Sequence, residues 1–149
     1  MIEPCALQSL GFNYQIDPYV GCEHNCHYCY AQNQPDLDWE NEIGICSDIK
    51  KLAEELALLT PQKIYMGMKT DPYQPLEKEY NQTRAALELL KERGFSVCIL
   101  TKSNLVIRDL ARDSGKLFFH PVMLIGKNCV SSWKTSGKTT ISIKRIGLA

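Results

Sequence analysis

The sequence predicts an α/β fold with a parallel sheet, and three observations support this prediction. Short apolar segments with strand character recur along the first 113 of the 149 residues. Amphipathic segments with helical periodicity lie between them, and turn-forming residues end each segment. Strands and helices that alternate at this spacing form βαβ units, whose strands pair in parallel and whose crossovers are right-handed.

The first strand is expected within residues 12–19 (FNYQIDPY), where apolar and polar residues alternate until Pro18 ends the pattern. A helix is expected in the segment SDIKKLAEELALLTPQ, with Ser47 as its N-cap and a stop at Thr60-Pro61. One face of this helix is apolar and consists of Ile49, Leu52, Ala53, Leu56 and Leu59.

A second unit begins with a buried strand at residues 63–68 (KIYMGM). The loop KTDPYQP follows, because its two prolines and its aspartate prevent a strand or helix from continuing. The next helix is expected in NQTRAALELLKERGF, with Asn81 as N-cap and Gly94 as the C′ residue. Ala85, Leu89 and their neighbours are expected to face the core.

A third strand is expected at residues 95–103 (FSVCILTKS), and a further helix begins within residues 104–112. In parallel sheets, ligands bind at the carboxyl ends of the strands. Three loops are expected at that edge: the cysteine-rich segment GCEHNCHYCYA, the loop KTDPYQP and the segment TKSN. They are distant in sequence, so the topology predicts one site built from three places.

The last 36 residues differ in composition from the rest. All 17 acidic residues and 11 of the 17 basic ones lie within residues 1–113, which gives that part a formal charge of −6 and the tail a charge of +6. Within the tail, residues 117–126 (LFFHPVMLIG) fit either a strand or a helix. We therefore divide the chain into residues 1–113 and a tail at residues 114–149.

Cysteine usage and the absence of targeting signals indicate a cytoplasmic protein. No apolar run approaches the length of a membrane span, and the start of the chain lacks the features of a signal peptide. Seven cysteines, three of them clustered, favour a metal centre in a reducing compartment over a disulfide framework. The other four are expected to be small buried residues: Cys5, Cys46, Cys98 and Cys129.

The clustered cysteines are Cys22, Cys26 and Cys29. A structural zinc site needs four ligands and usually takes two from a distant second pair, which this sequence lacks, although His24 or His27 could complete a strained site. Three thiolates suit an iron–sulfur cubane better, because they bind three irons and leave the fourth open for another ligand. A non-catalytic zinc or iron–sulfur module remains the alternative to an enzyme.

The spacing C-x3-C-x2-C, with an aromatic residue before the last cysteine, is the signature of the radical S-adenosylmethionine superfamily. The segments DPYVGCEHNCHYCYA, TDPYQPLEKEY and ILTKSNLVIRDL together resemble its spore photoproduct lyase-like branch, often called DNA repair photolyase. The resemblance covers roughly residues 12–110. It implies the N-terminal half of a (β/α)6 partial TIM-type barrel, followed by an atypical C-terminal tail.

The resemblance also implies roles for individual residues. The three cysteines would hold a four-iron four-sulfur cluster whose unique iron is chelated by S-adenosylmethionine, and reductive cleavage of this cofactor would give a 5′-deoxyadenosyl radical for hydrogen abstraction. Tyr28 would contact the adenine, Thr70 would support the methionyl amino group, and Lys102 would lie near the carboxylate. Asp71 is expected to be a turn starter. His24 and His27 are expected at the surface or behind the ligands.

The sequence departs from the family after about residue 112. Only three of the six βα units are recognisable, and the strands that would close the pocket have no evident counterpart, which puts the activity of this length of chain in question. The simplest interpretation is a truncated or frameshifted gene, and translation of the downstream DNA in the other frames would test it.

The resemblance implies an electron donor such as flavodoxin or ferredoxin as a partner. Nucleic acid is suggested as a partner by the family name alone, because residues 1–113 are acidic and show no basic stripe for phosphates. No membrane partner is expected. The substrate is not predicted.

Overall fold

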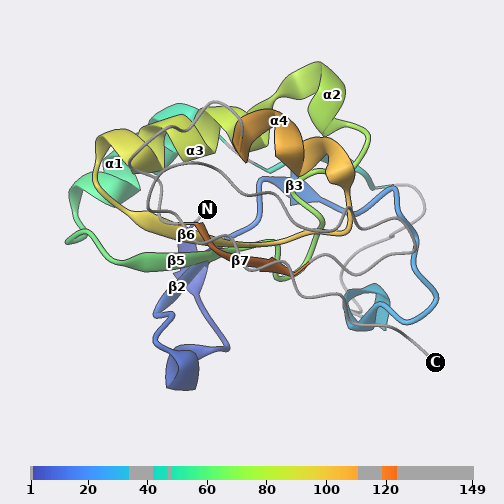
Figure 1. The fold of residues 1–149 in the computed structure, drawn as a ribbon, viewed down its shortest axis with the longest axis horizontal. Helices are drawn as coiled ribbons and strands as arrows, with labels where there is room; N and C mark the ends of the chain where they lie inside the picture. The colour runs from blue at the N-terminus through green and yellow to red at the C-terminus, as the bar shows by residue number, and fades with distance from the viewer. Residues whose placement is uncertain (1, 34–41, 47, 111–118, 124–149) are drawn as a thin grey trace, which may run out of the picture.

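The computed structural model describes residues 2–33, 42–46, 48–110 and 119–123. Its main feature is a five-stranded sheet in the order β1-β2-β5-β6-β7 (Figure 1). The strands are β1 (Ile2–Pro4), β2 (Tyr14–Ile16), β5 (Lys63–Met66), β6 (Ser96–Leu100) and β7 (Phe119–Met123).

Four of these strands pair in parallel and follow one another across the sheet in chain order. The fifth strand, β1, is antiparallel to β2, with Ile2 opposite Ile16. The predicted α/β class is therefore confirmed, but the sheet is mixed and open, with β1 and β7 as the edge strands of the described part. The antiparallel strand was not predicted because three residues are too short to show an alternating pattern.

The strand β7 lies in the segment that fitted either a strand or a helix from sequence. It pairs in parallel with β6, with Val97 opposite Phe119 and an irregularity between Cys98 and Leu100. The parallel sheet therefore extends into the predicted tail, where the sequence showed no further recognisable βα unit. The remainder of the predicted tail, including Cys129, lies outside the described residues.

The four α-helices of the described residues lie on one face of the sheet (Figure 1). Shorter elements are 3-10 helices and a two-stranded antiparallel sheet formed by β3 (Tyr19–Val20) and β4 (Gly44–Ile45). The 3-10 helices cover Gln8–Leu10, Tyr30–Asn33 and Asn104–Val106. The α-helices are α1 (Ile49–Ala57), α2 (Glu77–Tyr80), α3 (Gln82–Glu92) and α4 (Ile107–Leu110). None of these helices is long and apolar enough to cross a membrane.

The core lies between the helices and the strands. Alternate residues of the strands face the helices, and Val97 and Ile99 of β6 are completely buried there. The predicted apolar face of α1 is confirmed, because Leu52 and Leu56 are buried and Ile49 and Leu59 pack against the same core. The buried residues of α3 are Thr83, Ala86, Leu87 and Leu90, so its inner face is turned by about one residue from the predicted one.

The helix caps differ from the prediction. Asp48 is the N-cap of α1, and its carboxylate accepts hydrogen bonds from the N–H groups of Lys50 at 2.9 Å and Lys51 at 3.4 Å. Ser47, the predicted cap, lies outside the described residues. Asn81 precedes α3 in a left-handed conformation and does not cap it with its side chain. Gly94, with φ of 77°, is confirmed as the residue that ends α3.

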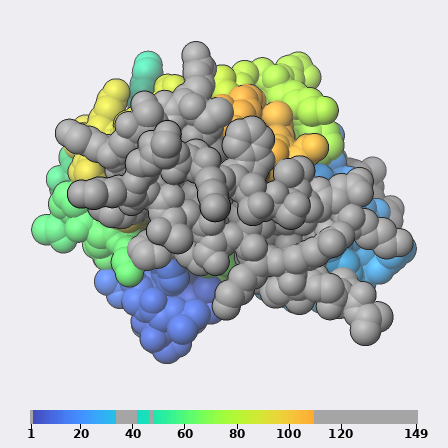
Figure 2. All heavy atoms as spheres, in the orientation of Figure 1, coloured from blue at the N-terminus to red at the C-terminus, as the bar shows by residue number. Residues whose placement is uncertain are grey.

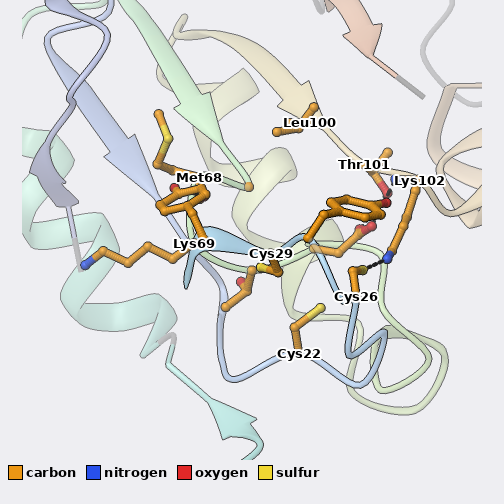
Figure 3. Close-up of a pocket in the computed structure, with 13 residues that line it drawn as sticks. Cys22, Cys26, Cys29, Met68, Lys69, Leu100, Thr101 and Lys102 are labelled. Atoms are coloured by element: carbon orange, nitrogen blue, oxygen red, sulfur yellow. Dashed lines mark hydrogen bonds between the residues drawn. The ribbon is translucent and has the colours of Figure 1, made fainter. Parts of the chain in front are cut away.

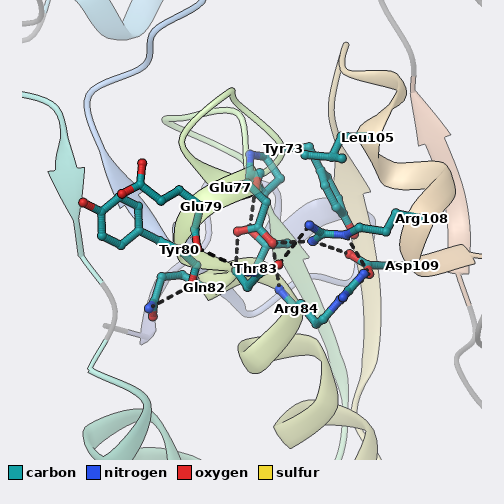
Figure 4. Close-up of polar contacts among 12 residues, drawn as sticks. Tyr73, Glu77, Glu79, Tyr80, Gln82, Thr83, Arg84, Leu105, Arg108 and Asp109 are labelled. Carbon is teal, nitrogen blue, oxygen red and sulfur yellow. Dashed lines mark hydrogen bonds and ion pairs between the residues drawn. The ribbon is translucent and has the colours of Figure 1, made fainter.

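The first turn of α3 is capped instead by the buried carboxylate of Glu77 in α2. This carboxylate accepts hydrogen bonds from the N–H groups of Thr83 at 2.9 Å and Arg84 at 3.3 Å. It also forms a 2.6 Å ion pair with Arg108 of α4 (Figure 4). In addition, it accepts a hydrogen bond from the Tyr19 hydroxyl at 2.5 Å. Burial and the neighbouring Glu77 raise the pKa of Tyr19. One acidic side chain thus joins α2, α3, α4 and β3.

Two strands end earlier than predicted. The strand β5 stops at Met66 because Gly67 follows with φ of 93°, a left-handed value that favours glycine. A Cβ atom at Gly67 would meet the carbonyl oxygen of Leu100 and lie 2.8 Å from the Cδ of Pro72. The chain leaves the sheet at this point and starts the loop KTDPYQP. The strand β6 likewise ends at Leu100, before the segment TKSN.

The N-terminal segment between β1 and β2 projects beyond the sheet. Figures 1 and 2 show it in dark blue at the lower side of the molecule, away from the helices. Leu10, at its 3-10 helix, is 66% exposed. Cys5 lies at the base of this segment and is buried, as predicted.

Candidate metal and cofactor site

A cavity of about 270 Å³ lies where three loops meet, at the carboxyl ends of β5 and β6. Its lining residues belong to the segments 22–30, 67–71 and 100–102 (Figure 3). The structure thus brings together all six residues that the sequence analysis assigned to a cluster or cofactor: Cys22, Cys26, Tyr28, Cys29, Thr70 and Lys102.

The cysteine loop starts from the small sheet formed by β3 and β4. Gly21, with φ of 67°, connects β3 to Cys22. A Cβ atom at this position would meet the carbonyl oxygen of Glu42 and lie 3.2 Å from the Cγ1 of Ile43. Glycine is therefore required here for two reasons, its left-handed conformation and the closeness of the opposite strand.

Two tight turns within the loop set the spacing of the cysteines. The N–H of Asn25 donates to the carbonyl oxygen of Cys22 at 3.2 Å, and the N–H of Cys29 donates to that of Cys26 at 2.9 Å. Asn25 is left-handed, with φ of 39°, a conformation that asparagine tolerates better than most residues. None of the three cysteines is in a disulfide, and all are half-buried.

Cys22 has a distinct electrostatic environment. Burial raises the pKa of its thiol, whereas hydrogen bonds from the backbone N–H groups of Asp71 and His24 act in the opposite direction. The same N–H groups would stabilise a thiolate bound to a metal. A half-buried thiol with donors aimed at its sulfur is suited to a ligand role.

Lys102 reaches across the cavity from the end of β6. Its Nζ donates a hydrogen bond to the Sγ of Cys26 and lies 5.9 Å from the centre of the Tyr28 ring (Figure 3). Burial lowers the pKa of this lysine, and a charged Cys22 opposes the change. The ammonium group is therefore held inside the site, where it can compensate for thiolate or carboxylate charge.

Thr70 is held by β3 and by Asp17, the residue after β2. Its hydroxyl donates to the carbonyl oxygen of Tyr19 at 3.3 Å, which leaves the oxygen free to accept from an ammonium group. Asp17 accepts hydrogen bonds from the N–H groups of Lys69 at 2.9 Å and Thr70 at 3.1 Å. Burial raises the pKa of Asp17, although these hydrogen bonds lower it.

Two tyrosines form an exposed wall of the cavity. Tyr28 is 63% exposed and Tyr30 is 58% exposed. The hydroxyl of Tyr30 donates to the carbonyl oxygen of Met68 at 2.5 Å, which ties the cysteine loop to the segment after β5. The Tyr28 ring makes its cation–π contact with Lys102 and offers a flat surface for a planar ligand.

Asp71 and Gln74, in the loop after β5, contact the site but were not assigned to it from sequence. Asp71 was interpreted only as a turn starter, and it does accept a hydrogen bond from the N–H of Tyr73 at 2.9 Å. It also accepts from the hydroxyl of Thr101 at 2.5 Å and the N–H of Lys102 at 2.9 Å. The Asp-Pro pair indicated the turn, but no sequence signal indicated the second set of contacts.

His24 and His27, and the described cysteines other than the clustered three, lie outside the cavity lining. His27 is exposed, and His24 packs behind the loop with its Nε2 3.4 Å from the Oδ2 of Asp71, so both fit the predicted secondary positions.

Two cysteines expected in the core are not there. Cys46 is exposed because it follows the two-residue strand β4. Cys98 is half-buried because it alternates with Val97 and Ile99 and faces away from the helices.

The cysteines of the cavity are not arranged as the ligands of a single metal ion. In the described part of the chain, no three His, Cys, Asp or Glu side chains are arranged around a single point as ligands of one ion. A four-iron cluster makes a different demand, because each thiolate binds its own iron. Three half-buried thiols on one cavity wall, with a lysine beside them, fit that demand in their chemistry.

Comparison with known proteins identifies related chains but no function. An uncharacterized protein of Methanocaldococcus jannaschii is 34% identical over 104 residues, which cover 67% of this chain and 39% of that protein. An uncharacterized protein of Mycobacterium tuberculosis is 30% identical over 112 residues, covering 68% of this chain and 33% of the relative. This chain therefore spans about a third to two fifths of the length of these relatives. No family model and no solved structure matches the chain.

Proposed function

We propose that the chain is the cluster-binding part of a radical S-adenosylmethionine enzyme of the spore photoproduct lyase-like branch. The proposal is carried by one observation. Three loops that are far apart in sequence bring three thiols, a hydroxyl, an ammonium group and an aromatic ring to one cavity. These are the groups that a cluster and a zwitterionic, adenine-bearing cofactor require.

Each group of residues in the cavity would have a separate role. Cys22, Cys26 and Cys29 bind three irons of a four-iron four-sulfur cluster. The hydroxyl oxygen of Thr70 accepts a hydrogen bond from the methionyl amino group, and Lys102 pairs with the carboxylate. Tyr28 stacks on or beside the adenine. When bound, the cluster supplies the electron for reductive cleavage of S-adenosylmethionine to the radical that abstracts hydrogen.

The position of Lys102 suits this role. Its ammonium group now contacts Cys26, and a cluster bound to that thiolate would free the ammonium to turn toward a carboxylate. The mostly apolar surroundings that lower its pKa also strengthen its attraction to an anion. The cavity of about 270 Å³ is close to the lower end of ligand pockets, roughly 300–1,000 Å³.

We further propose that the sheet is the N-terminal half of a (β/α)6 partial barrel. The parallel order β2-β5-β6-β7, with strands adjacent in chain order, supports this topology. In the longer relatives the remaining residues would supply the other strands and the substrate contacts. An electron donor such as flavodoxin or ferredoxin would be needed as partner, and a nucleic-acid substrate follows only from the name of the branch.

Anaerobic reconstitution of the full chain with iron and sulfide tests the proposal. We expect about four irons and four sulfides per chain, an electron paramagnetic resonance signal after reduction, and a change in that signal when S-adenosylmethionine is added. Reductive formation of 5′-deoxyadenosine, measured by chromatography, is the catalytic readout.

Two cysteine variants form a matched pair for this experiment. Cys29→Ala removes a thiol from the cavity wall and should abolish cluster assembly. Cys46→Ala removes an exposed thiol outside the cavity and should leave assembly unchanged. Binding of one zinc per chain without iron, or equal loss of iron in both variants, would rule out the proposed function in favour of another metal-binding module.

A further inference from the structure

The turn at residues 71–76, between the cavity and α2, contacts both elements that carry the metal-binding and cofactor-binding groups. Its side chains reach the cysteine loop on one side and the end of β6 on the other. The turn is itself ordered by hydrogen bonds, since the N–H of Gln74 donates to the carbonyl oxygen of Asp71 at 3.2 Å. This hydrogen bond links Asp71 and Gln74 within one turn.

Gln74 holds the backbone on both sides of Cys22. Its Oε1 accepts a hydrogen bond from the N–H of Glu23 at 2.9 Å, and its Nε2 donates to the carbonyl oxygen of Gly21 at 3.2 Å. The side chain of Gln74 is completely buried. A buried amide without partners is costly, so both hydrogen bonds are strongly favoured. With both neighbours fixed, the position of Cys22 is fixed as well.

The same turn binds the cysteine loop a second time. The N–H of Leu76 donates to the Oε2 of Glu23 at 2.6 Å. Glu23 therefore makes two contacts with the turn, one through its backbone and one through its carboxylate. The loop segment around Cys22 has little freedom to rotate relative to the turn.

Asp71 holds the other element, the end of β6. Its side chain is 8% exposed, and its two oxygens accept from the hydroxyl of Thr101 at 2.5 Å and from the N–H of Lys102 at 2.9 Å. These contacts fix the point from which the Lys102 side chain leaves the backbone. Hydrogen bonds to an ionised acceptor are stronger than neutral ones, which makes this anchor rigid.

We propose that Asp71 and Gln74 are positioning residues, which set the distance and orientation between the Cys22 ligand and the Lys102 ammonium group. Gln74 lies outside the cavity lining and acts through the backbone of the cysteine loop, and Asp71, which also lines the cavity, acts through the backbone at the end of β6. The inference rests on the proposed function, because only a bound cluster and cofactor would give the distance between Cys22 and Lys102 a role. The geometry itself can be measured without a cluster.

The first measurement uses the reduced, metal-free full chain. Alkylation of each thiol by iodoacetamide is followed by peptide mass spectrometry, with the exposed Cys46 as internal reference. Gln74→Met keeps the length of the side chain but removes both hydrogen bonds. We expect it to raise the alkylation rate of Cys22 relative to Cys46 severalfold, because the released loop exposes a thiol that is now half-buried.

The control for this measurement is Leu56→Ala, a core substitution in α1 that costs stability without touching the turn. It should leave the ratio of Cys22 to Cys46 alkylation unchanged. An unchanged ratio in Gln74→Met, or an equal rise in Leu56→Ala, would overturn the inference for Gln74. The alkylation measurement needs no cluster, so it tests the inference even if the wild-type chain assembles none. Failure to assemble a cluster would count against the proposed function alone.

The second measurement uses the reconstituted chain and Asp71→Asn. Asparagine preserves one acceptor oxygen but replaces the other with an NH2 donor, so in either orientation its amide loses one of the two backbone N–H groups, of Tyr73 or of Lys102, that Asp71 binds. We expect iron content to match wild type while the concentration of S-adenosylmethionine that half-saturates the spectroscopic change rises about tenfold, the effect of one lost interaction. A wild-type midpoint in Asp71→Asn would overturn the inference for Asp71, and this variant carries the test should Gln74→Met unfold.

Discussion

Removal of Arg108 should be among the most destabilising single changes in the helical layer. Its partner Glu77 has no exposed side-chain surface, and the two form a 2.6 Å ion pair. Loss of one partner from a buried pair typically costs about 3–5 kcal/mol, because a charge is left without compensation. The Glu77 carboxylate keeps its hydrogen bonds from Tyr19, Thr83 and Arg84. We therefore expect Arg108→Met to cost about 3 kcal/mol, the lower end of that range.

Urea unfolding followed by circular dichroism measures this loss. The matched control is Lys69→Met, which breaks the pair between Lys69 and Glu3, also at 2.6 Å but between side chains that are 38% and 51% exposed. An exposed pair contributes at most about 1 kcal/mol. Equal losses of unfolding free energy in the two variants would refute the claim that burial of Glu77 decides the cost. Glu77→Gln in the Arg108→Met background should recover part of the loss, because it removes the uncompensated charge.

Three further predictions concern the backbone and the carboxylates. Gly67→Ala should lower the free energy of unfolding by more than about 1 kcal/mol, because the new Cβ would meet the Leu100 carbonyl oxygen. Gly11 has a similar φ but open space around it, so Gly11→Ala should cost only the conformational strain. Thermal unfolding of the two variants compares these losses. Asp48→Ala should cost about 1 kcal/mol and Asp48→Asn much less, measured by urea unfolding, since only the alanine loses the cap. Burial raises the pKa of Asp17 above its usual 3.8, so the folded state binds more protons at this group than the unfolded state does. The contribution of Asp17 to stability therefore falls as pH rises through the folded pKa. Asp17→Asn should remove this contribution to the pH dependence of the unfolding free energy, measured between pH 4 and pH 7.

Much of this fold could be predicted because its signals are local. The helix α1 shows a clear apolar face, and the strands β5 and β6 are short apolar runs closed by turn residues. The parallel pairing of the strands follows from the alternation of elements, and with it the meeting of three loops at one edge. Three site residues could be named from the cysteine spacing, and the other three, Tyr28, Thr70 and Lys102, from the resemblance to a known family.

The unpredicted features depend on contacts between distant residues. Asn81 has the sequence appearance of an N-cap, but the carboxylate of Glu77 occupies the first turn of α3, and Asn81 instead turns to the left-handed region between α2 and α3. Cys98 lies in an apolar strand, yet its side of the strand faces away from the helices. The role of Gln74 requires knowledge of which loop lies above it. None of these contacts has a signature within a sequence window.

Three buried or partly buried carboxylates organise the site in the same way. Asp17, Asp71 and Glu77 each accept at least two hydrogen bonds from backbone N–H groups, and each also joins segments that are far apart in the sequence. An ionised carboxylate offers several acceptor positions, so it can order irregular loops that lack the hydrogen bonds of a strand or helix. All of these contacts lie within residues 17–109. The arrangement of the three thiols and Lys102 therefore depends on contacts made within this segment of the chain.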